Sequence, residues 1–220
     1  MAIKTSEKIK TICKVILEPK ILSALISQRE FGYLHDIGWF ESFKIKKAVD
    51  KNGNTIPWFT YSFIDFIENR LNSSLTVFEF GSGSSTIYFS KKVADIWSVE
   101  HNKEWYDIVA RSKNKNTRII LTDSDSESDY LAPLNNFSDK ASIIIVDGLH
   151  RNSCLRHSIN KITNDGVIIL DDSERNDYRS GIEYLESSGF KRLDFWGIAP
   201  TILFKKCTTL FYKSQNCLNV

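Results

Sequence analysis

The sequence predicts an α/β fold with a doubly wound, mostly parallel sheet and a helical N-terminal cap, for two reasons. From about residue 75 onward, short and continuously apolar runs alternate with helical stretches, which is typical of a parallel sheet buried on both faces. The first of these runs also leads directly into a glycine-containing turn. With 220 residues, 42% of them hydrophobic, the chain is long enough to bury such a core. We therefore expect a cap over residues 1–74 and an α/β domain over residues 75–220.

The cap is expected to be helical because its apolar residues recur at helical spacing. Residues 9–17 carry this pattern, and Pro19 separates it from a second run at 21–26. The stretch 32–57 is aromatic-rich and irregular. A further helix is expected after Pro57, because proline is favoured at the first helical position.

Seven apolar runs are expected to form the strands of the sheet. Only residues 197–200 separate the last two runs, which is too short for a crossover helix, so this pair is expected to be an antiparallel hairpin. The acidic segment 122–129 is interpreted as a solvated loop. The expected strands are 75–80, 96–99, 118–122, 142–147, 166–171, 191–196 and 201–206, and the expected helices are 85–94, 103–113, 152–163 and 178–188.

The net charge, the cysteines and the N-terminal residues indicate which kinds of partner and cellular compartment to expect. Twenty-nine Lys and Arg against 27 Asp and Glu leave a formal net charge of +2, which does not suggest a dedicated nucleic-acid surface. Four scattered cysteines without a CxxC motif indicate neither a zinc site nor a disulfide framework, and are typical of reduced thiols in the cytoplasm. Residues 1–20 contain charges every few positions, so we expect neither a signal peptide nor a membrane span.

The turn after the first expected strand is the most informative segment. The run VFEF leads into Gly81-Ser82-Gly83, and a helix is expected to begin between Ser84 and Thr86. Glycines allow the backbone to turn sharply, and free N–H groups at a helix start can face a polar ligand. The alternative is an ordinary strand-to-helix turn. The full GxGxxG dinucleotide fingerprint is absent, because position 86 is Thr.

Two glutamates indicate what kind of ligand the turn accommodates. Glu100 ends the next expected strand about 20 residues beyond the glycines, where an acidic side chain can accept hydrogen bonds from both ribose hydroxyls. Glu79 lies near the end of the first strand, where a carboxylate would repel a pyrophosphate and attract an ammonium group. The pair favours a nucleoside that bears an amino acid over NAD.

With these residues in place, the sequence resembles the class I S-adenosylmethionine-dependent methyltransferases. Their first motif, an acidic residue followed by xGxGxS, is matched by Glu79, Gly81, Gly83 and Ser85. The resemblance covers roughly residues 75–206 and implies a Rossmann-like sheet. It further implies that S-adenosylmethionine is the cofactor.

The resemblance also implies roles for individual residues. Ser85 or Thr86 would bind the carboxylate of the cofactor, Glu100 would bind its ribose, and the His101 ring would cover the adenine. The residues expected to bind cofactor are Glu79, Gly81, Ser82, Gly83, Ser85, Thr86, Glu100, His101 and Asp147. Candidates for recognising adenine, with solvated charges as the alternative, are Asp123, Asp125 and Glu127.

Three carboxylates follow the fourth and fifth expected strands. Asp147, Asp171 and Asp172 would converge at one edge of the sheet if these strands are neighbours, and would then need a cation, a shared proton or water. The pattern resembles a branch of the superfamily in which such residues bind Mg²⁺ or another divalent cation. The alternatives are that Asp171 caps the following helix or that Asp147 contacts the cofactor. The segment after Asp172 departs from the ending that is usual in that branch.

The catalytic candidates lie at the same edge. His150 is the leading general base, since its ordinary pKa suits proton removal near neutral pH, and Asp147 is the other candidate. Arg151 would bind an acidic acceptor or the cofactor carboxylate, with surface solvation as the alternative. Trp58 and Tyr61 are expected to contact the acceptor, although aromatic residues at helical spacing often belong to a core.

These observations predict a methyltransferase that transfers a methyl group from S-adenosylmethionine to a hydroxyl of a small molecule, such as a sugar or another polyhydroxylated metabolite. The first alternative is a non-catalytic nucleoside-binding module or partner subunit with the same fold. A nicotinamide-dependent oxidoreductase is disfavoured by the missing third glycine and by Glu79. The partner is expected to be a small-molecule acceptor and not a nucleic acid, and a homo-oligomer stays open.

Overall fold

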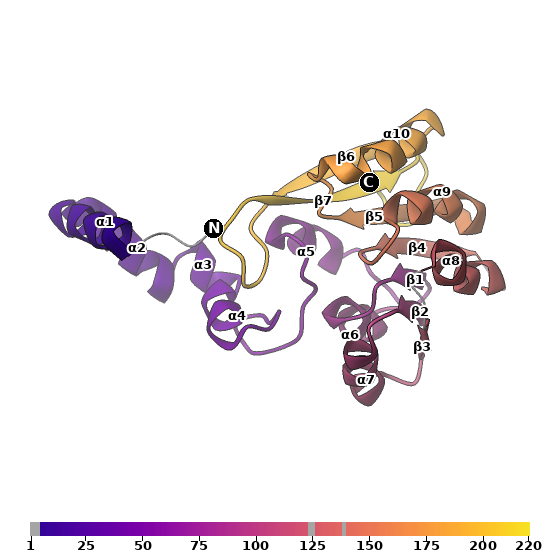
Figure 1. Cartoon of the computed structure of the whole chain (residues 1–220), viewed down its shortest axis with the longest axis horizontal. Coiled ribbons are helices and arrows are strands. Elements are labelled where there is room, and N and C mark those ends of the chain that lie inside the picture. Colours follow the sequence, from indigo (N-terminus) through magenta and orange to yellow (C-terminus); the bar gives the residue numbers. More distant parts are fainter. Residues whose placement is uncertain (1–4, 123–125, 138–139) are drawn as a thin grey trace.

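A seven-stranded sheet with the order β3-β2-β1-β4-β5-β7-β6 forms the centre of the computed structural model, which describes residues 5–122, 126–137 and 140–220 (Figure 1). The first five strands are parallel, and β7 is antiparallel to both β5 and β6. Because β1 lies between β2 and β4, the chain order reverses at β1, which is where open sheets bind ligands. The strands are β1 (Thr76–Phe80), β2 (Asp95–Glu100), β3 (Thr117–Leu121), β4 (Ala141–Val146), β5 (Ile162–Asp171), β6 (Lys191–Gly197) and β7 (Lys206–Tyr212).

Helices cover both faces of the sheet, so the predicted doubly wound α/β fold is confirmed (Figure 1). Alternate residues of β1 point to opposite layers, as in any strand. Val77 packs in the core cluster that contains α5 (Tyr61–Glu68) and α6 (Ser84–Ser90). Phe78 packs in the cluster on the other face. The remaining helices of the α/β layers are α7 (Lys103–Ser112), α8 (Glu127–Asn136), α9 (Arg151–Lys161) and α10 (Arg179–Ser187), with a short 3-10 turn at η1 (Asn176–Tyr178).

One helix lies where a solvated loop was expected, and the short helices α3 (Tyr33–Asp36) and α4 (Trp39–Ile45) lie in the stretch 32–57 that was expected to be irregular. Residues 122–129 were expected to be a loop, but α8 begins at Glu127, where the Ser126 hydroxyl accepts a hydrogen bond from the Asp129 amide. Serine at the N-cap and acidic residues in the first turn favour a helix start, which explains how an acidic segment initiates α8. Asp123 and Asp125 lie outside the described residues.

The last strand also differs from the prediction. The expected strand 201–206 belongs to the connection between β6 and β7, in which Leu203 and Phe204 are exposed. β7 is instead rich in threonine, and its buried Thr208 and Thr209 hydroxyls are hydrogen-bonded to carboxylates of neighbouring strands. A polar residue whose hydroxyl is satisfied in this way is compatible with a buried strand. The predicted antiparallel pairing of the last two strands is confirmed.

The N-terminal segment contains the two predicted helices, α1 (Thr5–Leu17) and α2 (Pro19–Glu30). They project away from the sheet, and neither contains a buried residue (Figure 1). α3 (Tyr33–Asp36) and α4 (Trp39–Ile45) lead from them towards α5. The boundary between residues 74 and 75 stays a prediction. None of the helices in the described ranges is long and apolar enough to cross a bilayer.

Candidate functional site

The turn after β1 is shaped by its close approach to the end of β4. Gly81 has φ +94°, and a Cβ at this position would lie 2.6 Å from the carbonyl oxygen of Asp147. The Gly81 amide donates a hydrogen bond of 2.9 Å to the carbonyl of Val99, so the turn also contacts the end of β2. Only glycine satisfies both the left-handed backbone and the short contact. The ends of the three strands therefore meet at Gly81.

Gly83 borders open space. A Cβ added there would meet no atom within 4 Å. The Gly83 amide donates a 3.0 Å hydrogen bond to the Thr86 hydroxyl, which in turn donates to Glu79 Oε2. The turn is thereby attached to the buried carboxylate below it, and its outer side faces a hollow.

Glu79 is completely buried beneath this turn, on the face of the sheet that α6 covers. Its Oε2 accepts hydrogen bonds from the hydroxyls of Thr86 (2.5 Å) and Ser98 (2.6 Å). Its Oε1 is buried and has no hydrogen-bond partner among the described residues. Burial raises the pKa of Glu79 to about 7, although the nearby hydroxyls act in the opposite direction. A carboxylate with an unused oxygen is suited to a positively charged group.

Glu100 ends β2 and points at the glycine turn. Its Oε2 accepts hydrogen bonds from the amide and the hydroxyl of Ser82, at 2.9 and 3.0 Å. Its Oε1 accepts from the amides of His101 (3.0 Å) and Asn102 (2.8 Å). The carboxylate thus joins the tips of β1 and β2, with 3% of Glu100 exposed.

A pocket of about 250 Å³ opens where these strand ends meet. It lies at the reversal of strand order, the position at which open α/β sheets bind ligands. Glu79 and Thr86 do not line the pocket but support the turn from below. The lining residues are Trp58, Gly81, Ser82, Gly83, Ser84, Ser85, Glu100, His101, Trp105, Asp147 and Gly148.

Trp105 was not singled out in the sequence. It lies in the first turn of α7, and its ring centroid is 5.9 Å from that of Trp58, with the two planes nearly perpendicular. Trp58 Nε1 is buried and donates to no described residue. Its position in the sequence could have identified it as a pocket residue, because Trp105 follows Glu100 by five residues and so lies at the same edge of the sheet.

Tyr61 and His150, which were both predicted for the site, lie outside the pocket. Tyr61 is 2% exposed, and its hydroxyl is 3.5 Å from Ser42 Oγ inside the core. The reason is that α5 begins at Tyr61 and not directly after Pro57, which turns this side chain inward. His150 does not line the pocket: its Nδ1 is 4.0 Å from Glu127 Oε2 on α8.

Arg151 is neither solvated nor directed into the pocket. Its guanidinium donates to Asp147 Oδ1 at 3.0 Å, to the carbonyl of Asp171 at 2.6 Å and to the carbonyl of Gly148 at 3.0 Å. Arg151 therefore holds Asp147 at the wall of the pocket. Burial raises the pKa of Asp147, and the neighbouring Arg151 opposes this effect.

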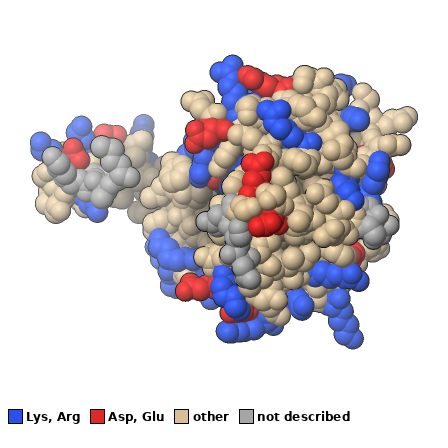
Figure 2. Space-filling view, turned by 45° about the vertical axis from the view of Figure 1, so that its right-hand side comes forward, with Lys and Arg blue, Asp and Glu red and all other residues tan. Residues whose placement is uncertain are grey.

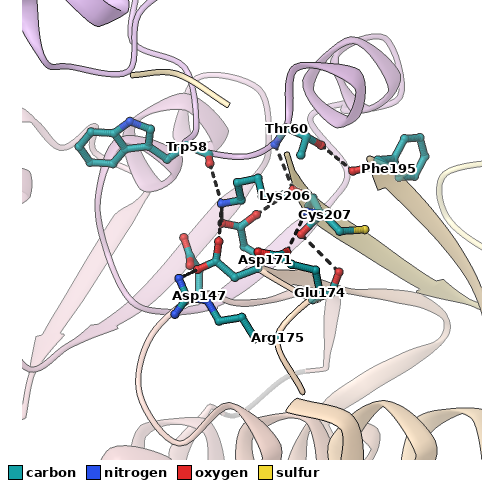
Figure 3. A network of polar contacts seen from close by, with 12 residues as sticks. Trp58, Thr60, Asp147, Asp171, Glu174, Arg175, Phe195, Lys206 and Cys207 are labelled. Atoms are coloured by element: carbon teal, nitrogen blue, oxygen red, sulfur yellow. Dashed lines mark hydrogen bonds and ion pairs between the residues drawn. The ribbon is translucent and has the colours of Figure 1, made fainter. Parts of the chain in front are cut away.

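The three predicted carboxylates do come together, because β4 and β5 are neighbouring parallel strands. The Lys206 ammonium group pairs with Asp171 (Figure 3). It also pairs with Asp172 Oδ1. Asp147 pairs with Arg151. Within the described ranges, no group of three or more His, Cys, Asp or Glu side chains is arranged to hold a metal ion. The predicted divalent site of Asp147, Asp171 and Asp172 does not fit this arrangement, because side-chain cations occupy it.

No protein-family model and no curated protein sequence matches the chain. Similar solved structures include precorrin-6y C5,15-methyltransferase from Geobacter metallireducens, with 14% identity, a TM-score of 0.55, and coverage of 70% of this chain and 88% of that one. A methyltransferase from Pyrococcus furiosus has 13% identity and a TM-score of 0.50, over 90% and 98% of the two chains. An rRNA methylase from Streptococcus thermophilus has 12% identity and a TM-score of 0.51, over 68% and 92%. The chain has the fold of the class I S-adenosylmethionine-dependent methyltransferases.

Proposed function

We propose that the chain is an enzyme that binds S-adenosylmethionine in the pocket between β1, β2 and β4 and transfers its methyl group to an acceptor. The observation that carries this proposal is the position of Glu100, whose buried carboxylate adjoins the glycine turn at the wall of the pocket. The likeness in fold to methyltransferases supports it.

Two further observations support a fit to this cofactor. The unpartnered Oε1 of Glu79 offers negative charge beneath the turn, which suits the ammonium group of a methionine moiety. The open space beside Gly83 leaves room for the chain of that moiety to pass the backbone. Glu100 would then exchange its hydrogen bonds from Ser82 for hydrogen bonds from the ribose hydroxyls. His101, Trp58 and Trp105 would enclose the adenosine.

Methyl transfer from S-adenosylmethionine does not require a covalent bond between the protein and the methyl group. When bound, S-adenosylmethionine supplies a methyl group already activated by its sulfonium. The residues of the chain align the acceptor oxygen with that methyl, exclude water and accept the acceptor proton. Asp147 is best placed for the proton, because it lines the pocket and burial raises its pKa. His150, the first choice from sequence, lies outside the lining residues and is the weaker candidate.

We further propose that the acceptor is a hydroxyl of a small molecule, such as a sugar or another polyhydroxylated metabolite. The fold alone does not select an acceptor, since the similar structures include an rRNA methylase and a precorrin methyltransferase. The expected absence of a nucleic-acid partner is therefore unsupported by the comparisons. A small acceptor is favoured by the balanced charge, with acidic side chains among the basic ones on the face seen in Figure 2.

Isothermal titration calorimetry with S-adenosylmethionine tests the binding step. We expect one site in the wild type, and a dissociation constant raised about tenfold or more in Glu100→Ala, which corresponds to about 1.4 kcal/mol. Glu104→Ala is the matched control, because Glu104 is an exposed carboxylate on the first turn of α7. Absence of heat with the wild type, or binding of NAD in its place, would contradict the proposal.

The alternative is a non-catalytic module that binds the same cofactor. It is distinguished by Asp147→Asn, with hydroxylated metabolites screened as acceptors. We expect this variant to bind S-adenosylmethionine as the wild type does but to lose methyl transfer. A wild type that binds the cofactor and methylates no acceptor in the screen would favour the module.

A further inference from the structure

The carboxyl ends of β4 and β5 bring Asp147, Asp171 and Asp172 together beside the pocket. We infer that Lys206 is a resident cation that takes the place of a divalent metal at this edge, so that the site functions without a bound metal ion. This inference concerns the carboxylates next to the pocket and does not depend on which cofactor the pocket binds.

Three oxygen acceptors surround the Lys206 ammonium group. Nζ pairs with Asp171 Oδ2, lies 2.7 Å from Asp172 Oδ1, and donates a 3.3 Å hydrogen bond to the carbonyl of Trp58 (Figure 3). An ammonium group has three donors, and these three acceptors match them. Only 4% of the side chain is exposed. The position that oxygen ligands would offer to a metal ion is therefore filled.

Of the four carboxylate oxygens that Lys206 does not contact, three have a hydrogen-bond or ion-pair partner. Asp171 Oδ1 accepts a 2.7 Å hydrogen bond from the Thr208 hydroxyl. Asp172 Oδ2 is 2.6 Å from Arg175, and Asp147 Oδ1 is 3.0 Å from Arg151. No side chain has to move for the carboxylates to be satisfied, which is the condition under which buried charges are stable.

The carboxylates at this edge are balanced by side-chain cations. At most three negative charges, those of Asp147, Asp171 and Asp172, face three cations, those of Lys206, Arg151 and Arg175. The ion pairs with Asp171 and Asp172 offset the cost of burying the Lys206 ammonium group. A divalent cation placed beside this ammonium would meet a repulsion that no unpaired carboxylate offsets.

Lys206 also connects the two walls of the pocket. Its bond to the carbonyl of Trp58 attaches the segment that carries the Trp58 ring. On the other side, Asp172 lies 3.7 Å from Arg151, which holds Asp147. Lys206 thus contacts one wall of the pocket directly, at Trp58, and the other through Asp172 and Arg151.

The decisive measurement uses the wild-type protein with Mn²⁺ as the probe. We expect electron paramagnetic resonance titration to detect no bound Mn²⁺, and the thermal unfolding midpoint to be the same in EDTA and in millimolar Mg²⁺. One tightly bound Mn²⁺ per chain, or a midpoint that falls in EDTA, would overturn the inference. S-adenosylmethionine is absent throughout, so this result is separate from the test of the proposed function.

A second measurement uses Lys206→Ala, which removes the ammonium group, leaves the Asp171 carboxylate without a cationic partner and leaves Asp172 Oδ1 without its ion pair. We expect a lowered unfolding midpoint, one Mn²⁺ bound at about 1 mM or below, and partial recovery of the midpoint when Mn²⁺ is added. Lys206→Arg should retain the cation and bind no Mn²⁺. Lys205→Ala is the matched control, because Lys205 is the exposed neighbour whose Nζ lies over the Trp196 ring.

A folded Lys206→Ala that binds no Mn²⁺ would show that the carboxylates are not a cation site, and would also overturn the inference. Adding Asp172→Asn to Lys206→Ala should abolish the acquired Mn²⁺ binding, which assigns the ion to this edge. If Lys206→Ala does not fold, the wild-type measurement alone decides.

Discussion

Glu79 illustrates how burial changes the chemistry of one carboxylate. It has no exposed surface, and two hydroxyls satisfy only one of its oxygens. Its pKa is raised from 4.5 to about 7, chiefly by burial. The group is therefore poised between its neutral and charged forms near neutral pH, and an approaching ammonium group would favour the charged form.

This shift predicts a pH dependence of stability. Between pH 4.5 and 7 the folded chain holds a proton on Glu79 that the unfolded chain has released, so the free energy of unfolding falls as pH rises through this window. We expect a loss of about 3 kcal/mol that is absent in Glu79→Gln. Urea unfolding at several pH values checks this, with the exposed Glu104→Gln as control. Parallel pH curves for wild type and Glu79→Gln would contradict it.

At the scale of elements, α7 is positioned by the residue before it. The Asn102 side chain accepts hydrogen bonds from the amides of Glu104 and Trp105, and the Asn102 amide donates to Glu100. One residue thereby caps the helix, connects it to the end of β2 and orients Trp105 towards Trp58. The helix start and the pocket wall depend on the same contacts.

We therefore expect Asn102→Ala to lower the free energy of unfolding by about 1 kcal/mol, as for the loss of other N-cap side chains. Its affinity for S-adenosylmethionine should also fall, because Trp105 is no longer oriented. Asn102→Asp keeps the capping oxygen and should keep the stability. Chemical denaturation and calorimetry measure the two effects. An alanine variant as stable as the wild type would show that the cap contributes nothing.

At the scale of the whole molecule, stability comes from the two core layers on either side of the sheet. The helices α1 and α2 lie outside both layers, and their large apolar side chains are exposed. In Figures 1 and 2 they form a projection distinct from the rest of the chain. Equivalent substitutions should therefore have unequal effects in the two regions.

Ile67 and Ile12 make a matched pair for this comparison. Ile67 lies in α5 with 0% exposure, whereas Ile12 lies in α1 with 57% exposure. We expect Ile67→Ala to cost roughly 2–5 kcal/mol and Ile12→Ala to stay within about 0.5 kcal/mol, both measured by urea unfolding. A large loss for Ile12→Ala would mean that α1 is packed against a partner.

Part of the site could be predicted from the sequence because the rule behind it is local. Apolar runs that alternate with helices imply parallel strands, and parallel strands bring their carboxyl ends to one edge. Gly81, Glu100 and Asp147 follow such runs, and all three line the pocket. The positions of these three residues directly after apolar runs were enough to predict that they lie close together.

The partners of the buried charges could not be predicted in this way. Lys206 is 35 positions from Asp171 in the chain, and it was expected to end a strand that in fact begins with it. Tyr61 was expected at an exposed helix end and is buried in the core.

The sequence by itself determined the alternation of strands and helices, the glycine turn and most of the polar residues at one edge of the sheet. Only the tertiary structure decided which of these residues face the pocket and which neutralise one another. The physical reason is that Lys206 meets Asp171 and Asp172 through the register of β7 against β5. That register depends on the packing of whole layers and not on any local pattern.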